Sequence, residues 1–314
     1  MKKIFDKVTL VLSITIVFYL SIIFVSDFSK IDSINLELSY IPIIVSLLIL
    51  HTIISGYKYH RMLQKLNIPI SFLETQKIYL CGFALALTPG GFGTAAIKSK
   101  LVKQKFGTPI SSTILILYVE RWTELIAILI ILGISLLFFF VLESFLIFVI
   151  GSLIVGIFSI LVTNTKTFTS IKKLLMKINY FKKINNSIEK SRNSFVVLSE
   201  KNSFLEALFY SIVTKIIHLF TVYSVFLMVG IDLGFFMSGI VYYTSILIGN
   251  LSFLPAGIIV TESGMIAMLI KNNIEFSLAT LVVVVIRFVG TWSLAIAGTI
   301  GYQILARKYS KIDN

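Results

Sequence analysis

Residues 78–93, IYLCGFALALTPGGFG, decide the fold of this 314-residue chain. The segment begins as an apolar stretch of the kind that enters a bilayer, and it then runs into Pro89-Gly90-Gly91-Phe92-Gly93. Proline and clustered glycine break helices. Broken backbone at membrane depth is tolerated only where protein or a water-filled cavity surrounds it. We therefore expect a broken helix here, and its free backbone groups mark a candidate functional site.

The composition around this segment places the chain in a membrane. Apolar residues make up 57% of the sequence and charged residues 14%, whereas soluble domains carry about 25% charged residues. A membrane-spanning helix needs about 20 apolar residues. Six stretches meet that length: Val8–Val25, Leu38–Gly56, Ser112–Phe140, Ser144–Val162, Phe204–Val229 and Leu278–Leu305. We predict an all-α polytopic protein of the cytoplasmic membrane, with a single membrane domain over residues 1–314.

The distribution of charge predicts how the broken segments enter the membrane. A second apolar stretch, 235–254, runs into Pro255-Ala256-Gly257. If the first broken segment crossed fully, the lysines at 98–105 would lie outside, against the positive-inside rule. If both are re-entrant hairpins, six full spans remain, both termini are cytoplasmic and the inner segments hold 23 of the 28 Lys and Arg residues. Counting each hairpin as one helix gives eight transmembrane helices.

An internal repeat relates the two broken segments. A shift of 166 residues superposes Pro89 on Pro255, Gly91 on Gly257 and Arg121 on Arg287. Each half then has three crossings, an odd number, so the second half is expected to lie upside down. We predict two inverted-topology repeats, residues 7–141 and 142–305, the second containing a basic amphipathic cytoplasmic linker at 163–202. Inverted repeats with broken helices are typical of alternating-access transporters.

The candidate substrate-binding residues lie at the two breaks and among the charges inside the spans. A helix that begins at mid-membrane presents free N–H groups and a positive dipole end, which bind anions. Charges inside a span are costly and face protein or a cavity, and arginine binds phosphate through a bidentate fork. The resulting set is Pro89, Gly90, Gly91, Gly93, Pro255, Gly257, Arg121, Arg287, Lys215, Glu120, Glu124 and Glu262.

Each candidate also has a structural interpretation, which the sequence leaves open. Glycines of this kind are typical of close helix–helix packing. The three cations and three acids among the candidates cancel in charge, so they are able to pair with one another. The candidate ion pairs are Arg121 with Glu120 or Glu124, Arg287 with Glu262, and Lys215 with any of these acids.

Several classes of protein have no signature in the sequence. There is no Gly-x-x-x-x-Gly-Lys-Ser/Thr motif, no metal-ligand cluster and no Gly-x-Ser-x-Gly motif. The one long hydrophilic stretch, 163–202, is too short for a catalytic domain. We therefore expect no enzyme activity, no catalytic residues, no cofactor and no metal. The net charge of +13 is explained by the inner loops, so nucleic acid is not an expected partner.

The motifs resemble those of the lysylphosphatidylglycerol synthase transmembrane region, or flippase-like, family, over roughly residues 5–305. The resemblance rests on the first break, on Val119-Glu120-Arg121-Trp122-Thr123-Glu124, and on the second break with Glu262 and Arg287. It implies translocation of lipid between leaflets, with the synthase chemistry in a separate soluble domain. The family often carries an acid where Thr94 stands, and glycines where Ala256 and Ile259 stand.

The leading hypothesis is a flippase-like transporter of an anionic or phosphate-bearing lipid, either an aminoacyl-phospholipid or a polyprenyl-phosphate-linked sugar. Its head group would enter a cavity between the repeats, where Arg121, Arg287 and the broken helices hold the phosphate. Two alternatives stay open: an ion- or proton-coupled small-solute transporter in which Glu262 or Glu120 carries a proton, and a membrane partner of a separately encoded lipid-modifying synthase. Membrane lipids are the expected partners, and a homo-oligomer stays open.

Overall fold

The chain is helical through the parts that the structure describes. This computed structural model describes residues 36–88, 91–252 without 164–195, and 254–310, and no strand occurs among them. The predicted span Val8–Val25, most of the predicted linker 163–202, and Pro89 with Gly90 lie outside the described residues. The all-helical architecture expected from the sequence is confirmed for the described part.

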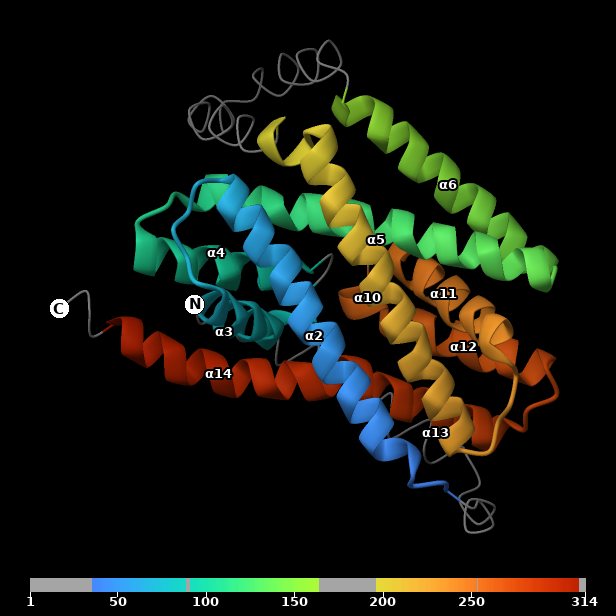
Figure 1. Cartoon of the computed structure of the whole chain (residues 1–314). Coiled ribbons are helices and arrows are strands. Elements are labelled where there is room, and N and C mark those ends of the chain that lie inside the picture. Colours follow the sequence, from blue (N-terminus) through green and yellow to red (C-terminus); the bar gives the residue numbers. More distant parts are fainter. Residues whose placement is uncertain (1–35, 89–90, 164–195, 253, 311–314) are drawn as a thin grey trace.

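The helices follow the order of the apolar stretches. The first half contains α2 (Tyr40–Lys65), α3 (Phe72–Gly82), η2 (Phe83–Leu85), α4 (Phe92–Phe106), α5 (Ile110–Phe138) and α6 (Leu142–Thr163). The second half contains α10 (Lys201–Met228), α11 (Phe235–Leu251), η4 (Pro255–Gly257), α12 (Val260–Lys271), α13 (Phe276–Arg287), η5 (Phe288–Trp292) and α14 (Ser293–Ser310). Figure 1 shows α2 and α10 running diagonally across α5 and α14, with short helices between α5 and α14.

Several helices have the length and composition of membrane spans. Four qualify among the described residues: Tyr40–Lys65, Ile110–Phe138, Lys201–Met228 and Phe276–Leu305. Shorter apolar helices occur at Leu142–Ile157 and Phe235–Leu251. Large apolar side chains remain exposed on these helices, such as Leu137 at 85% and Ile304 at 67%. Such an apolar surface suits contact with lipid rather than water.

The first broken segment is a helical hairpin. Glu74, in the first turn of α3, forms an ion pair with Lys105 in the last turn of α4. At the other end of the hairpin, the Gly93 N–H donates to Thr88 Oγ1 at 2.7 Å. The two ends of the broken segment therefore lie together, and the break forms the tip of the hairpin.

The second broken segment, α11–η4–α12, folds back in the same way. A Cβ at Gly257 would lie 3.1 Å from Gly249 Cα, so the two helices approach closely near the tip. The turn holds Ala256 at φ 50° and Ile259 at φ 75°. Positive φ favours glycine, and a β-branched residue there is strained. In the family that the sequence resembles, these two positions more often hold glycine. The turn therefore keeps its positive-φ backbone here with alanine and isoleucine in place of glycine.

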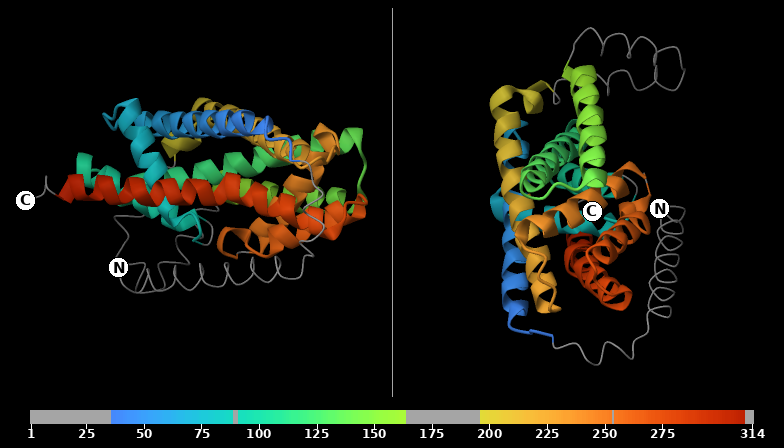
Figure 2. Two further views of the ribbon diagram at one scale, coloured as in Figure 1. Left: turned by 90° about the horizontal axis from the view of Figure 1, so that it is seen from below. Right: turned by 90° about the vertical axis from the view of Figure 1, so that its right-hand side faces the viewer.

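One helix boundary has the spacing of the predicted repeat, and two of the long helices pack in opposite directions. Helices α5 and α13 begin at Ile110 and Phe276, 166 residues apart. Helix α2 packs antiparallel to α10, since the Glu37 N–H donates to the Met228 carbonyl at 2.9 Å at one end. At the other end Arg61 bonds Glu206. Figure 1 also shows α5 and α14 running in opposite directions, and Figure 2 shows α2 and α10 side by side.

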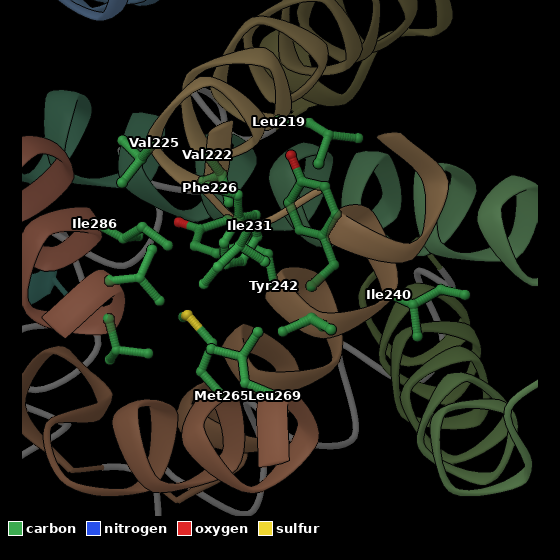
Figure 3. Packing of buried hydrophobic residues seen from close by; sticks show 14 of the residues in the cluster. Leu219, Val222, Val225, Phe226, Ile231, Ile240, Tyr242, Met265, Leu269 and Ile286 are labelled. Carbon is green, nitrogen blue, oxygen red and sulfur yellow. The ribbon is translucent and has the colours of Figure 1, made fainter. Parts of the chain in front are cut away.

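Two apolar clusters hold the helices together. The larger joins α5, α10, α11, α12 and α13, and Figure 3 shows its centre around Phe226, Met265 and Leu269, all fully buried. The smaller joins α2, α3, α4, α5 and α14 around Leu63 and Leu101. Because lipid tails are as apolar as these side chains, close packing rather than exclusion from water stabilises such contacts in a bilayer.

The hairpin packing predicts opposite effects at two glycines. Gly249→Ala should lower the thermal stability, because its Cβ would overlap Thr261 Oγ1 in α12; overpacking of this kind costs about 1–3 kcal/mol. Gly156→Ala, in α6, has nothing within 4 Å and should raise stability by up to about 1 kcal/mol through helix propensity. Thermal unfolding of the purified variants in detergent measures both. Equal melting temperatures for the two variants would contradict the close approach of α11 and α12.

Candidate functional site

One partly buried carboxylate bonds cations from three helices. Glu124 of α5 has its Oε1 3.2 Å from Lys58 Nζ of α2. Its Oε2 lies 3.2 Å from Arg121 Nη1 of the same helix and 3.7 Å from Lys215 Nζ of α10. We call these four residues the Glu124 cluster. Three positive charges share one negative charge, so the cluster has an excess of positive charge.

Hydroxyl groups fix the geometry of this cluster. Lys58 Nζ also donates to Ser211 Oγ at 3.2 Å, and Ser211 Oγ donates to Thr123 Oγ1 at 2.9 Å. Thr123 in turn donates to the Val119 carbonyl of its own helix at 2.8 Å. This chain of bonds joins α2, α10 and α5. Lys58 is therefore held at the Glu124 carboxylate by both halves of the molecule.

The first break lies directly beside the Glu124 cluster. A Cβ at Gly91 would lie 2.5 Å from Arg121 Nη2, so the guanidinium lies directly against the backbone at the break. Gly91 has φ 72° and precedes the first turn of α4, which has no acidic residue and no side-chain cap. The positive end of α4 and Arg121 therefore face each other. The Arg121 side chain is 52% exposed, so it is accessible to a ligand.

The structure adds two cations to the buried charges. The sequence assigned Lys58 and Lys98 to the inner segments, and within the protein they are 1% and 3% exposed. Lys98 Nζ of α4 lies 2.7 Å from Glu120 Oε2 of α5, and 4.2 Å from the centre of the Tyr59 ring. Lys58 is buried because α2 continues to Lys65, and Lys98 is buried because α4 packs against α5. The buried charges therefore do not cancel, because two more cations belong to them.

The second break holds a closed ion pair instead of an accessible arginine. Arg287 Nε of α13 lies 2.7 Å from Glu262 Oε1, in the first turn of α12. Arg287 Nη2 also donates to the Ala256 carbonyl in the turn at 3.0 Å. The two side chains are 7% and 1% exposed. The sequence predicted this ion pair as the structural alternative to substrate binding. It connects α13 to the turn between α11 and α12.

The two halves thus carry buried ion pairs of opposite polarity. In the first half the cation, Lys98, is on the helix after the break and the acid, Glu120, is on the next helix. In the second half the acid, Glu262, is on the helix after the break and the cation, Arg287, is on the next helix. Related backbones therefore hold different electrostatic sites. The first break is the one with an excess of positive charge.

An aromatic and imidazole group extends from the cluster toward the second half. His218 of α10 lies one turn beyond Lys215, and its Nε2 is 2.7 Å from the hydroxyl of Tyr242 in α11. The His51 ring of α2 meets the His218 ring edge-on at 5.4 Å. A Cβ at Gly290 would lie 3.2 Å from the same imidazole. Gly290 belongs to η5, a π-helical turn that directly follows Arg287; π-helical turns are frequent at functional sites.

Sequence reasoning missed Lys58, Lys98 and Tyr242 as members of the polar network. A signal for Lys58 was its spacing of seven residues from His51, which puts both on one face of α2. Among the residues that the structure describes, no group of His, Cys, Asp or Glu has the arrangement of a metal site.

The fold and the buried polar site define a multi-spanning, all-helical membrane protein. The chain belongs to the family described as the lysylphosphatidylglycerol synthase TM region, whose model matches residues 10–298. It is also 26% identical over 239 residues to a UPF0104 membrane protein of Methanocaldococcus jannaschii, a match that covers 73% of this chain and 97% of that protein. No solved structure gives a significant match. The family expected from the sequence motifs is confirmed.

The buried ion pair at the second break should be strongly coupled. Glu262→Gln or Arg287→Met alone should destabilise the fold by about 3–5 kcal/mol, because each leaves a buried charge without its partner. The double variant should recover much of that loss. Lys271→Gln, in the exposed pair of Lys271 with Glu143, is the control and should cost less than about 1 kcal/mol. Additive losses from the two single variants, measured by unfolding in detergent, would contradict the coupling.

Proposed function

We propose that this protein is a flippase-like transporter that moves an anionic or phosphate-bearing lipid between membrane leaflets. The observation that carries the proposal is the Glu124 cluster, in which Lys58, Arg121 and Lys215 share one carboxylate. An excess of positive charge at a partly buried site is costly without an anion. A phosphate group supplies that charge and has the oxygen geometry that arginine and lysine bind.

The geometry assigns different roles to the two arginines. Arg121 is half exposed and faces the uncapped start of α4, so it would bind the phosphate together with Lys215 and the free N–H groups of that helix. Arg287 is enclosed by Glu262 and the turn carbonyl of Ala256. Arg287 would therefore hold the shape of the second hairpin, whereas the first hairpin would bind the substrate.

The proposed path runs between two inverted repeats. The antiparallel packing of α2 against α10 and the recurrence of helix starts after 166 residues support this topology. With the hairpins re-entrant and Val8–Val25 as a span, six full spans place both termini on the cytoplasmic side of the cell membrane, in accord with the positive-inside rule. The head group would cross through the polar space between the halves while the apolar chains stay in lipid.

The proposed role needs neither catalysis nor a cofactor from this chain. Substrate lipids would be aminoacyl-phospholipids or polyprenyl-phosphate-linked sugars, made by a separately encoded enzyme. An ion- or proton-coupled small-solute transporter is the second candidate, and the His51–His218–Tyr242 contacts beside Lys215 favour it.

Lipid movement in proteoliposomes tests the proposal. The full chain should accelerate the flip of fluorescent phosphatidylglycerol well above that in empty vesicles. Arg121→Gln and Lys215→Gln should each slow it about tenfold or more, because one charge-assisted hydrogen bond is worth about 1.5–3 kcal/mol. Lys271→Gln, outside the cluster, should transport normally. The proposal fails if no lipid moves, and uptake of a soluble solute with a pH gradient would instead support the second candidate.

A further inference from the structure

A second group of cations surrounds a small pocket at one end of the α2–α10 pair. The pocket is small and partly open to the outside, and Lys58, Arg61, Lys65, Ser203 and Glu206 contribute to its lining. Arg61 Nε lies 2.5 Å from Glu206 Oε1, and Lys65 Nζ lies 3.8 Å from Glu206 Oε2. Two cations thus share the Glu206 carboxylate, and Lys58, which bonds Glu124, also lines the pocket.

A buried hydroxyl group lines the pocket. Ser203 is 7% exposed, and its Oγ makes no hydrogen bond to any described residue. It lies in the first turn of α10, where the backbone N–H groups of a helix are free and the dipole is positive. A buried hydroxyl without a partner is costly. An oxyanion in the pocket would accept its hydrogen bond and lie at the positive end of α10.

The surroundings of the pocket suit a lipid better than a free anion. Leu205 and Phe209 are 49% and 61% exposed and lie four residues apart on α10, next to the pocket residues Glu206 and Tyr210. Residues four apart share one face of a helix. An apolar chain attached to the bound phosphate would therefore lie along this exposed face, in the membrane.

We propose that this pocket binds the phosphate of a membrane lipid and is the inner entry station to the Glu124 cluster. Lys58 connects the two sites, because it lines the pocket and its Nζ also bonds Glu124 and Ser211. A phosphate in the pocket contacts Arg61, Lys65 and Ser203, and it then passes Lys58 on its way to Arg121 and Lys215. The entry role rests on the proposed function, whereas binding in the pocket does not.

Lipid binding by the full chain tests the pocket separately from transport. Native mass spectrometry measures the binding of phosphatidylglycerol in the Arg121→Gln background, where the cluster contributes less. Arg61→Gln with Lys65→Gln should weaken binding about tenfold or more, since each lost cation removes a charge-assisted hydrogen bond. Ser203→Ala should weaken it severalfold. Glu206→Gln should strengthen binding, because it releases Arg61 and Lys65 from their ion pairs. A misfolded variant would not show this gain.

A matched control and two further probes decide the outcome. Lys105→Gln removes a cation of similar exposure from the pair with Glu74 and should leave binding unchanged. Diacylglycerol, which lacks the phosphate, should not bind. Unchanged binding in the Arg61→Gln, Lys65→Gln variant would overturn the proposal. Glycerol 3-phosphate that competes as well as the lipid would overturn the assignment to a lipid.

The proposed function and the pocket fail in distinguishable ways. If wild-type protein binds phosphatidylglycerol through Arg61 and Lys65 but moves no lipid, the pocket stands and the proposed function fails. If the Arg61→Gln, Lys65→Gln variant flips lipid at the wild-type rate, the proposed function stands and the entry role is overturned.

Discussion

The sharing of the Glu124 carboxylate by three cations is the constraint on which the rest of the structure depends. Lys58, Arg121 and Lys215 come from three helices and both halves of the chain, so their positions fix how α2, α5 and α10 meet. Like charges held at one carboxylate repel, and in an apolar surrounding that repulsion is weakly screened. The packing of α2 against α10 and the hydroxyl chain through Ser211 hold them there. A bound anion would relieve this repulsion.

The same backbone plan is used for two purposes. In the first half, glycine at the break makes room for Arg121 and leaves it accessible. In the second half, Arg287 closes onto Glu262 and the turn carbonyl, and the turn keeps its shape although Ala256 and Ile259 occupy positions of positive φ. The structure thus has a closed ion pair at one hairpin and an accessible arginine beside the other.

Much of the fold could be predicted from the sequence, because a bilayer restricts the secondary structures that a chain can form. Helices are the natural way for a chain this apolar to satisfy its backbone in lipid, and proline with glycine located both breaks. Contacts between distant helices were not readable. Lys58 looked like an inner-face lysine because it follows an apolar run, and only the continuation of α2 to Lys65 and its packing on α10 bring it to Glu124. Likewise, Arg121 and Arg287 are equivalent in the repeat, and only tertiary structure separates the exposed one from the buried one.

Density for a bound lipid tests the central claim most directly. The measurement is a cryo-electron microscopy map of the full chain in nanodiscs that contain phosphatidylglycerol. The account predicts a phosphate-sized density within hydrogen-bond distance of Arg121 and Lys215, with its apolar chains leading to the membrane. A map in which Arg121 and Lys215 contact only Glu124 and water, while ordered lipids lie elsewhere, would contradict it.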